Sequence, residues 1–449
     1  MTTIPGITDF PELLMEGVLP PDLQGTLVRI GPAGSDGAGG ADGAGGADVA
    51  NGQRGMLHAV ELRDGKAVSY IARASAADTN VFWHGGSVLA LPEFGLPLQY
   101  SRELDPREFG GGLTVPISSH TRLEAATGRR VLFGVDDSGE TPVLRFGEWA
   151  ADGSLASAQT VPLERATWQH DIGITPEHLV FIESPTEPLG AGASVDYRWA
   201  PGAEGWLGVV RRADGMVEEA ATQWLRLDPS VVTHVLGAMP AEGGRALDVY
   251  VVVYPAPEKG QPVDLEAPVV GSSQRGIGMV TIGGGLGVLE RWRISGVGEA
   301  QLRLERRQVD ERFVEYPRVD GLCEGGNFRY GYGVELGFGL AGTAATVDGV
   351  EHFGLLKFDF ERDEVASWSP GVGRVASEPL FVRGDGGRSD DEGWVLCVVD
   401  DSYRGGSDLY VLDASAFGRR SPQAVVHLPD GVRLPFRSHG TWVSASWYR

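Results

Sequence analysis

Apolar and polar residues alternate with a period of two in several short segments of the chain. The segments that show this alternation are residues 225–228, 291–294, 302–305 and 356–360. Successive side chains of a β-strand point to opposite faces of the sheet, so this pattern is typical of half-buried antiparallel strands. We therefore expect many strands with one face in the core and one face toward water.

Other segments are apolar on both faces and predict strands buried between two layers. They are residues 178–182, 247–254 and 394–399. Clusters of Gly, Asp and Pro separate the predicted strands. Residues 8–17 predict the one short helix, because Asp9 is suited to its N-cap and the segment ends on a glycine.

Many short strands, separated by turns and without helices long enough for parallel crossovers, predict an all-β sandwich, barrel or propeller. The length of 449 residues favours a propeller, since ~4–8 four-stranded blades use a chain of this size naturally. Residues 31–55 are a low-complexity run of Gly, Ala and Asp, which predicts a flexible surface loop. No second domain boundary is visible, so residues 1–449 are expected to form a single domain.

The charge of the chain limits its partners. Lys and Arg number 38 against 61 Asp and Glu, which gives a net charge of −23. Such a field repels phosphate backbones and anionic lipid, so nucleic acid is not an expected partner. Contact between a membrane and a small apolar patch stays open. The N-terminus shows no secretory signal, and Cys323 and Cys397 follow no metal-binding spacing, so we expect a cytoplasmic protein.

Four of the nine histidines stand at the predicted starts of strands: His120, His170, His234 and His439. They are separated by 50, 64 and 205 residues. A blade of a seven-bladed propeller would average about 64 residues, which would place the four histidines around a common axis. This spacing does not select these four out of nine, and a hydrogen-bonded structural role is the other interpretation of each.

A series of motifs spread over nearly the whole chain resembles the carotenoid cleavage oxygenases. The motifs are residues 25–32 (GTLVRIGP), 55–60 (GMLHAV), 80–86 (NVFWHGG), 169–171 (QHD), 315–318 (EYPR), 377–382 (SEPLFV) and 439–442 (HGTW). Each motif alone is a weak signal, but together, in this order, they are specific.

The resemblance implies a seven-bladed β-propeller with non-haem Fe(II) on its axis and with loops and short helices over one face. The implied ligands are His120, His170, His234 and His439. The glutamates implied to hold three of the rings through hydrogen bonds are Glu93, Glu315 and Glu378. Neutral imidazole is a suitable ligand for ferrous iron, and carboxylates behind the rings fix their tautomer and orientation.

The function implied by the resemblance is an Fe(II)-dependent dioxygenase. Such an enzyme would use O2 to cleave a conjugated carbon–carbon double bond of a carotenoid or apocarotenoid into two carbonyl products, with no catalytic residue beyond the metal centre. Cleavage of a stilbene-like or other aromatic alkene is the alternative. Arg122, two residues after His120, could pair with a phenolate but could not accept a proton from a phenol. A lactonase-type propeller with calcium on oxygen ligands and a non-catalytic propeller also stay open.

The residues beside three of the implied ligands depart from the family pattern. They are Ser119, Thr233 and Ser438. These changes alter the surroundings of the metal and leave the substrate open. Without the resemblance, Glu315 would be predicted as a solvated surface residue.

The remaining histidines are expected to lie outside the site. We predict structural roles for His58, His84 and His427, and positions in loops for His178 and His352.

Overall fold

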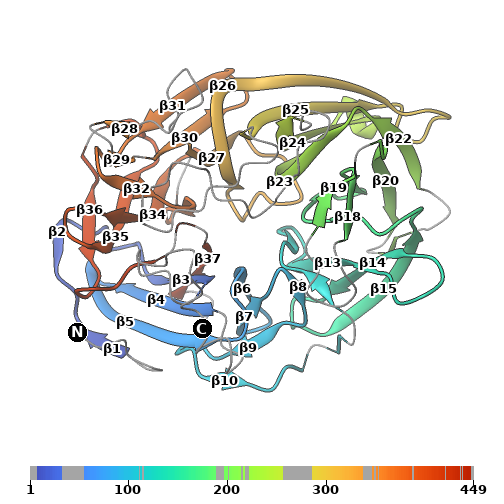
Figure 1. Cartoon of the computed structure of the whole chain (residues 1–449). Helices are drawn as coiled ribbons and strands as arrows, with labels where there is room; N and C mark the ends of the chain where they lie inside the picture. The colour runs from blue at the N-terminus through green and yellow to red at the C-terminus, as the bar shows by residue number, and fades with distance from the viewer. Residues whose placement is uncertain are drawn as a thin grey trace.

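The structure is a computed structural model. It describes residues 8–32, 55–110, 112–113, 116–188, 197–200, 202–213, 216–217, 222–255, 286–336, 346–347, 350–351, 353–386, 389–419, 421–434, 436 and 438–445. In the view of Figure 1, antiparallel sheets stand side by side in a ring around a central axis. The sheets are the blades of a β-propeller.

The first three blades are separate sheets, each with its strands in order from the axis outward. The first contains β37 (His439–Ser444), β3 (Gly25–Pro32), β4 (Gly55–Arg63), β5 (Lys66–Ser75) and β1 (Thr8–Pro11). The second contains β6 (Asn80–His84), β7 (Ser87–Leu91), β9 (Leu98–Tyr100) and β10 (Pro106–Arg107). The third contains β12 (Arg122–Glu124), β13 (Arg129–Asp136), β14 (Val143–Trp149) and β15 (Leu155–Pro162).

The fourth, fifth and sixth blades follow in chain order. The fourth contains β16 (Ile172–Ile174), β17 (His178–Glu183), β20 (Gly205–Ala213) and β22 (Gln223–Leu227), with β21 (Met216–Val217) also paired to β20. A seven-stranded sheet supplies the fifth and sixth blades: β23 (Ser230–Ala241), β24 (Ala246–Pro255), β25 (Val288–Ser295), β26 (Arg303–Val319), β27 (Tyr330–Glu335), β30 (Gly354–Asp359) and β31 (Glu364–Trp368). The long strand β26 is the outer strand of the fifth blade and the inner strand of the sixth.

The seventh blade completes the ring. It contains β32 (Arg374–Ala376), β33 (Leu380–Arg383), β34 (Gly393–Asp401), β35 (Gly406–Asp413), β36 (Ala424–His427) and β2 (Met15–Gly17). Three two-stranded sheets and a short 3-10 helix accompany the blades in the described part of the chain: β8 (Phe94–Gly95) with β11 (Ile117–Ser118), β18 (Thr186–Pro188) with β19 (Tyr197–Trp199), β28 (Thr346–Val347) with β29 (Val350–Glu351), and η2 (Glu242–Gly244). The expected seven-bladed, all-β architecture is confirmed.

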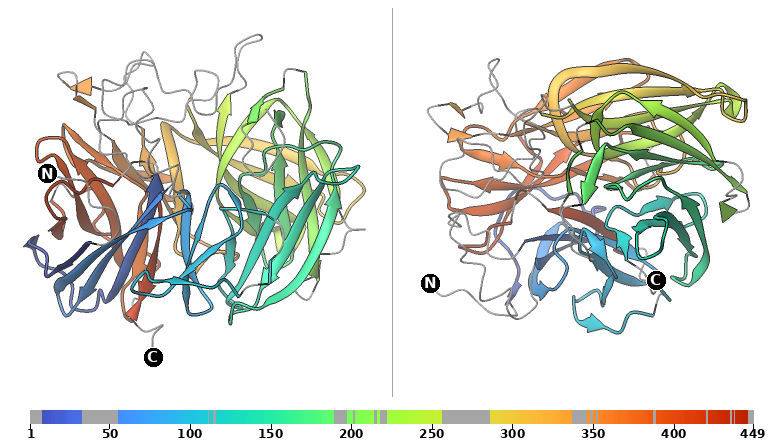
Figure 2. Two further views of the ribbon diagram at one scale, coloured as in Figure 1. Left: turned by 60° about the horizontal axis from the view of Figure 1, so that its bottom comes forward. Right: turned by 45° about the vertical axis from the view of Figure 1, so that its right-hand side comes forward.

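Strands from both ends of the chain close the ring. The C-terminal strand β37 pairs with β3 inside the first blade, with Ile30 opposite His439. The N-terminal strand β2 pairs with β36 on the outer edge of the seventh blade. The two coloured ends of the chain accordingly meet in neighbouring blades in Figures 1 and 2.

The helix expected over residues 8–17 is absent, and this prediction was wrong. The segment forms β1 and β2, with a left-handed residue, Glu12 (φ 44°), between them. Pairing with the exposed edges of β5 and β36 satisfies the backbone groups of both strands. These edges come from distant parts of the chain, so the residues of the segment itself gave no indication of them.

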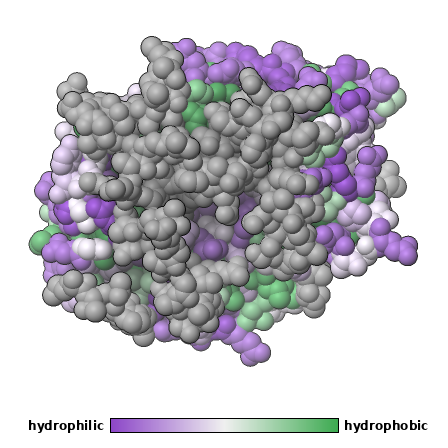
Figure 3. Space-filling model, viewed as in Figure 1, coloured by the Kyte–Doolittle hydropathy of each residue, from purple (hydrophilic) through white to green (hydrophobic). Residues whose placement is uncertain are grey.

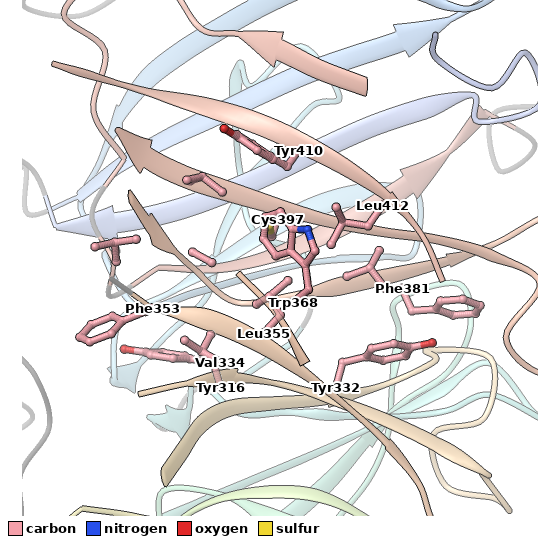
Figure 4. Close-up of a cluster of buried hydrophobic side chains, with 14 of the residues drawn as sticks. Tyr316, Tyr332, Val334, Phe353, Leu355, Trp368, Phe381, Cys397, Tyr410 and Leu412 are labelled. Carbon is pink, nitrogen blue, oxygen red and sulfur yellow. The ribbon is translucent and has the colours of Figure 1, made fainter. Parts of the chain in front are cut away.

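The core lies mainly between neighbouring blades. Figure 4 shows one such layer, where Tyr316 and Leu355 of the sixth blade face Cys397 and Leu412 of the seventh. The predicted doubly buried strands are confirmed as β17, β24 and β34. Apolar contact between blades therefore supplies the rigidity that keeps their inner strands around the axis.

Strand β30 is more buried than its alternating pattern predicts. Lys357 and Asp359, expected to face water, are buried, because each has an ion-pair partner: Lys357 Nζ lies 2.6 Å from Asp391, and Asp359 lies 2.7 Å from Arg329. Pairing of this kind reduces the cost of burying a charge.

The described part of the outer rim is largely polar. Hydrophilic residues, purple in Figure 3, occupy much of the upper and right-hand rim. No helix of the described residues is long and apolar enough to cross a membrane. Residues 33–54 of the predicted loop lie outside the described residues, while Gly31 and Pro32 belong to β3 and Gly55 begins β4.

Truncation of a core residue between blades should destabilise the propeller. Leu355 is fully buried, so Leu355→Ala removes apolar contacts and leaves a cavity; we expect a loss of about 2–5 kcal/mol in the free energy of unfolding, measured by chemical denaturation. The matched control is Leu14→Ala, since Leu14 is 81% exposed and should change stability by less than about 0.5 kcal/mol. Equal effects of the two substitutions would contradict the assigned core.

Candidate metal centre

Four imidazole rings meet on the propeller axis. The ring of His120 lies 4.1 Å from that of His170, 4.9 Å from that of His234 and 4.7 Å from that of His439, measured between centroids. The Nε2 atoms of His170 and His234 are 3.2 Å apart. The structure thus brings together the four histidines singled out in the sequence.

Each histidine reaches the axis from the inner edge of a different blade. His120 and His170 each lie two residues before the inner strands β12 and β16, and His439 is the first residue of β37. His234 lies within β23, where the pairing with β24 shifts register between Val232 and Gly237. A bulge re-aims the side chains of a strand, which explains how a residue inside β23 can point to the axis.

The geometry of the rings suits a metal ion. Ligand atoms of His120, His234 and His439 all lie within 4.8 Å of one another. Nε2 of His120 is buried and has no hydrogen-bond partner among the described residues. A buried nitrogen lone pair without a partner is costly, and a cation between the rings would satisfy it. The donor set, all imidazole nitrogens, is one that iron and zinc accept.

A glutamate stands behind each of three rings. Nδ1 of His170 lies 2.5 Å from Glu93, Nδ1 of His234 lies 2.6 Å from Glu315, and Nδ1 of His439 lies 2.8 Å from Glu378. A carboxylate accepts a hydrogen bond and cannot donate one, so Nδ1 of each ring carries the proton. In the neutral form of the ring, the Nε2 lone pair is then left for a metal. The structure therefore places the three glutamates implied by the family motifs beside three of the four rings.

The buried glutamates are held as carboxylates. Burial alone would raise the pKa of Glu315, but His234 and the hydrogen bonds from Tyr254 and the Tyr316 backbone outweigh burial and bring the pKa to about 2. Burial likewise opposes ionisation of Glu378, and Arg318, His439 and Arg29 bring its pKa to about 2. Burial lowers the pKa of His120 well below its usual value, so this ring is neutral at pH 7.

The three residues that depart from the family pattern are all hydroxyl residues with a common role. The Ser119 hydroxyl donates to Glu93 at 3.4 Å, and the Thr233 hydroxyl donates to Glu315 at 2.9 Å. The Ser438 hydroxyl accepts a hydrogen bond of 2.9 Å from Arg29. Each therefore belongs to the polar network behind a ring.

Arg29, on β3 of the first blade, joins this blade to the seventh, and the sequence analysis did not single it out. Its guanidinium is buried and donates to Glu378 at 3.2 Å, to the Ser377 hydroxyl at 3.1 Å and to the Ser438 carbonyl at 2.7 Å. A Cβ atom at Gly440 would lie 2.3 Å from Cδ of Arg29, so glycine is required for this close approach. The signal in the sequence was an arginine inside the otherwise apolar run of residues 25–32.

A second ion pair supports the bulge that carries His234. Asp171 accepts hydrogen bonds of 2.9 Å from Arg122 and 2.8 Å from the backbone N–H of Val235. Arg122 also donates to Glu324 at 3.3 Å and to the carbonyl of Val235. The guanidinium of Arg122 is thus occupied by groups of the protein.

The described histidines outside the cluster lie away from it. Nδ1 of His58 is 2.6 Å from the Tyr70 hydroxyl, Nε2 of His84 is 2.7 Å from the Ala150 carbonyl, and Nδ1 of His427 is 3.1 Å from Asp408. His178, expected in a loop, instead begins β17 and is buried. His352 lies outside the described residues.

A cavity of about 390 Å³ borders the cluster on one side. His120, His234 and His439 are among the residues that line it, and further lining residues come from the inner strands β6, β12, β23, β26 and β37. Phe82, Trp83, Phe381 and Trp442 are among the lining residues. The site therefore combines a nitrogen-rich cluster with a partly aromatic cavity.

Fold and site define a β-propeller with four histidines on its axis, in an arrangement that could hold a metal ion. Residues 69–444 match the family model RPE65, described as retinal pigment epithelial membrane protein. Because the match covers most of the chain, the protein belongs to this family, which is the carotenoid cleavage oxygenase family that the motifs indicated.

Individual relatives agree with this assignment. The chain is 27% identical over 392 residues to isoeugenol monooxygenase of Pseudomonas putida, covering 82% of this chain and 75% of the relative. It is 23% identical over 485 residues to apocarotenoid-15,15'-oxygenase of Synechocystis, covering 95% and 92%. The crystal structure of Pseudomonas brassicacearum lignostilbene dioxygenase superposes with a TM-score of 0.78 at 20% identity, covering 98% and 96%, and shows the same fold.

Removal of a carboxylate behind a ring should weaken metal binding. In Glu315→Gln the neutral amide is a poorer partner for Nδ1 of His234, and we expect metal affinity to fall by about 10–100-fold. Anaerobic titration with ferrous or cobaltous ion measures the affinity. Glu305→Gln, an exposed position on the same strand β26, is the matched control and should bind metal as the unaltered protein does. Unchanged affinity of the Glu315 variant would contradict the proposed role.

Substitution of Arg29 by lysine should loosen the closing blade. Lys keeps the charge, but one ammonium group cannot replace a planar guanidinium that contacts Glu378, Ser377 and Ser438 together. We expect a loss of about 2–5 kcal/mol in the free energy of unfolding, measured by denaturant titration. Arg145→Lys, at a part-exposed arginine paired with Asp136, should change stability by less than about 1 kcal/mol.

Proposed function

We propose that the protein is a non-haem Fe(II)-dependent dioxygenase that cleaves a conjugated carbon–carbon double bond into two carbonyl products. The observation that carries the proposal is the cluster of His120, His170, His234 and His439, with a glutamate behind three rings, in a member of this family. Relatives named for oxygenase activity on isoeugenol and on apocarotenoids support the same reaction class.

Ferrous iron, when bound, supplies a centre that activates O2 for attack on the alkene. The four histidines would hold the ion through Nε2 and contribute no negative charge. Glu93, Glu315 and Glu378 would keep the rings in the metal-binding tautomer and orientation.

The other residues of the site position the reactants rather than exchange protons with them. Glu315 and Glu378 are fully occupied by hydrogen bonds from the protein, so neither is free to act on substrate as an acid or base. The aromatic walls would exclude water and hold an apolar alkene against the metal. Selection of the double bond then depends on which part of the substrate the walls place beside the histidines.

A carotenoid or apocarotenoid is the first candidate for the substrate. An aromatic alkene is the second, because Phe82, Trp83 and Trp442 offer flat surfaces close to the cluster and because isoeugenol monooxygenase is among the relatives. A phenol contact through Arg122 gains no support, since Asp171, Glu324 and the Val235 carbonyl occupy its guanidinium.

Two other classes of propeller protein would differ from this one in metal ligands or in oxygen consumption. A lactonase-type propeller would require oxygen ligands for calcium on the axis, whereas the cluster offers imidazole nitrogens. A non-catalytic propeller would consume no O2. Both are separated from the proposed function by measuring iron content, oxygen consumption and products with a panel of carotenoids and aromatic alkenes.

The decisive variant is His170→Ala. We expect it to lose stoichiometric iron after reconstitution with ferrous salt, and to lose O2-dependent formation of aldehydes, identified by mass. His427→Ala is the matched control, because His427 contacts Asp408 and Glu16 away from the axis, and it should keep both iron and turnover. Oxygen consumption with a polyene in the His170 variant would refute the ligand assignment, and absence of iron from the unaltered protein would refute the proposed cofactor.

A further inference from the structure

The cavity on the propeller axis contains a buried guanidinium that the described protein does not neutralise. Arg130, on β13, is 7% exposed and lines this cavity. Its Nη1 donates to the Thr121 hydroxyl at 3.0 Å, and its guanidinium lies 4.1 Å from the centre of the Phe82 ring. Among the described residues, no other hydrogen bond and no ion pair holds it, and its buried Nε has no partner.

The other arginines that line the cavity each have a carboxylate. Arg122 pairs with Asp171 and Glu324, Arg318 lies 3.6 Å from Glu378, and Arg383 lies 2.6 Å from Asp320. These acidic groups, with the exposed-loop residue Asp385, are the negative charges of the lining. Within the part of the chain that the structure describes, Arg130 is the one lining arginine without an ion pair.

The electrostatic surroundings of Arg130 favour an added anion. Burial, together with the positive charges of Arg318 and Arg122, lowers the pKa of Arg130 to about 10, and attraction by Glu324 only partly offsets this. The Glu324 carboxylate binds Arg122 instead. A buried, unpaired charge is expensive, and an anion in the cavity would compensate it.

The walls around Arg130 define the rest of the ligand. Phe82 and Trp83 lie on β6, Leu123 lies on β12, and Trp442 lies on β37. These side chains offer apolar and aromatic surface within a volume of about 390 Å³, which is in the range that small organic ligands occupy. A bare inorganic anion would leave this surface in contact with water.

We propose that the axial cavity binds a small aromatic or apolar monocarboxylate, with the carboxylate on Arg130 and the apolar body along the aromatic wall. The carboxylate accepts a hydrogen bond from the part of the guanidinium that faces the cavity. Binding at this position requires neither iron nor O2, so the proposal stands or falls separately from the proposed dioxygenase activity.

Calorimetric titration of the ferrous protein under nitrogen tests the site, with benzoate as the probe. We expect benzoate to bind on the order of ten- to a hundredfold more tightly than benzyl alcohol, which has the same ring without the charge. Equal binding of the two ligands, or binding of inorganic phosphate as tight as that of benzoate, would overturn the proposal.

Arg130→Met keeps an apolar side chain over Phe82 and removes the charge. Benzoate affinity should fall on the order of ten- to a hundredfold in this variant, with benzyl alcohol affinity unchanged. Arg145→Met, which removes an arginine on the neighbouring strand outside the cavity, should bind benzoate normally. Retained benzoate binding in the Arg130 variant would show that the carboxylate sits elsewhere, on the metal for example, and would overturn the proposal.

A second measurement covers the case in which the Arg130 variant does not fold. Benzoate should protect the unaltered protein against thermal unfolding with or without ferrous ion, because the site does not include the metal. Protection that occurs only with ferrous ion would place the carboxylate on the metal and contradict the assignment to Arg130.

Discussion

The hydrogen bonds between buried glutamates and the far nitrogens of the histidine rings are the constraint on which the site depends. Four imidazoles crowded on one axis repel one another when protonated, and a neutral imidazole can present either nitrogen to the centre. Glu315 and Glu378 fix the choice of nitrogen for His234 and His439. Each carboxylate accepts a hydrogen bond from Nδ1–H, so Nε2 is the nitrogen that faces the centre. Burial opposes ionisation of these carboxylates, but attraction by His234 at Glu315 and by Arg318 at Glu378, together with hydrogen bonds, brings the pKa of each to about 2.

The surrounding fold is arranged around those carboxylates. Tyr316 adopts a left-handed conformation (φ 52°) where β26 shifts register, and its backbone N–H donates to Glu315. Arg29 spans the first and seventh blades to reach Glu378, and Gly440 makes room for it. Strain and close approach at these positions persist because large apolar layers between the blades hold the inner strands in place.

Sequence patterns predicted the parts of the fold that depend on local regularity. Period-two alternation located β22 and β25, continuous apolar runs located β24 and β34, and chain length favoured a propeller. The number of seven blades came from the family resemblance. The helix predicted for residues 8–17 was wrong, because pairing with the edges of two distant strands outweighs the local helix signals. Glu315, by its local sequence, resembled a surface residue, because nothing near it in the chain shows that Thr233, His234 and Tyr254 will surround it.

The sequence by itself indicated an all-β propeller through its strand periodicity and its length. Its motifs, through their resemblance to a known family, indicated the family and the four histidines, because motifs are local properties of the chain. Only the tertiary structure showed the role of the residues beside the histidines that depart from the family pattern. Ser119, Thr233 and Ser438 looked like separate departures, yet each places a hydroxyl in the network behind a ring. Only the structure, too, showed that Arg122 is paired while Arg130 is not. Hydrogen bonds and ion pairs can join residues that lie hundreds of positions apart in the chain. Which of these contacts form depends on distances in space, and the order of the residues does not give those distances.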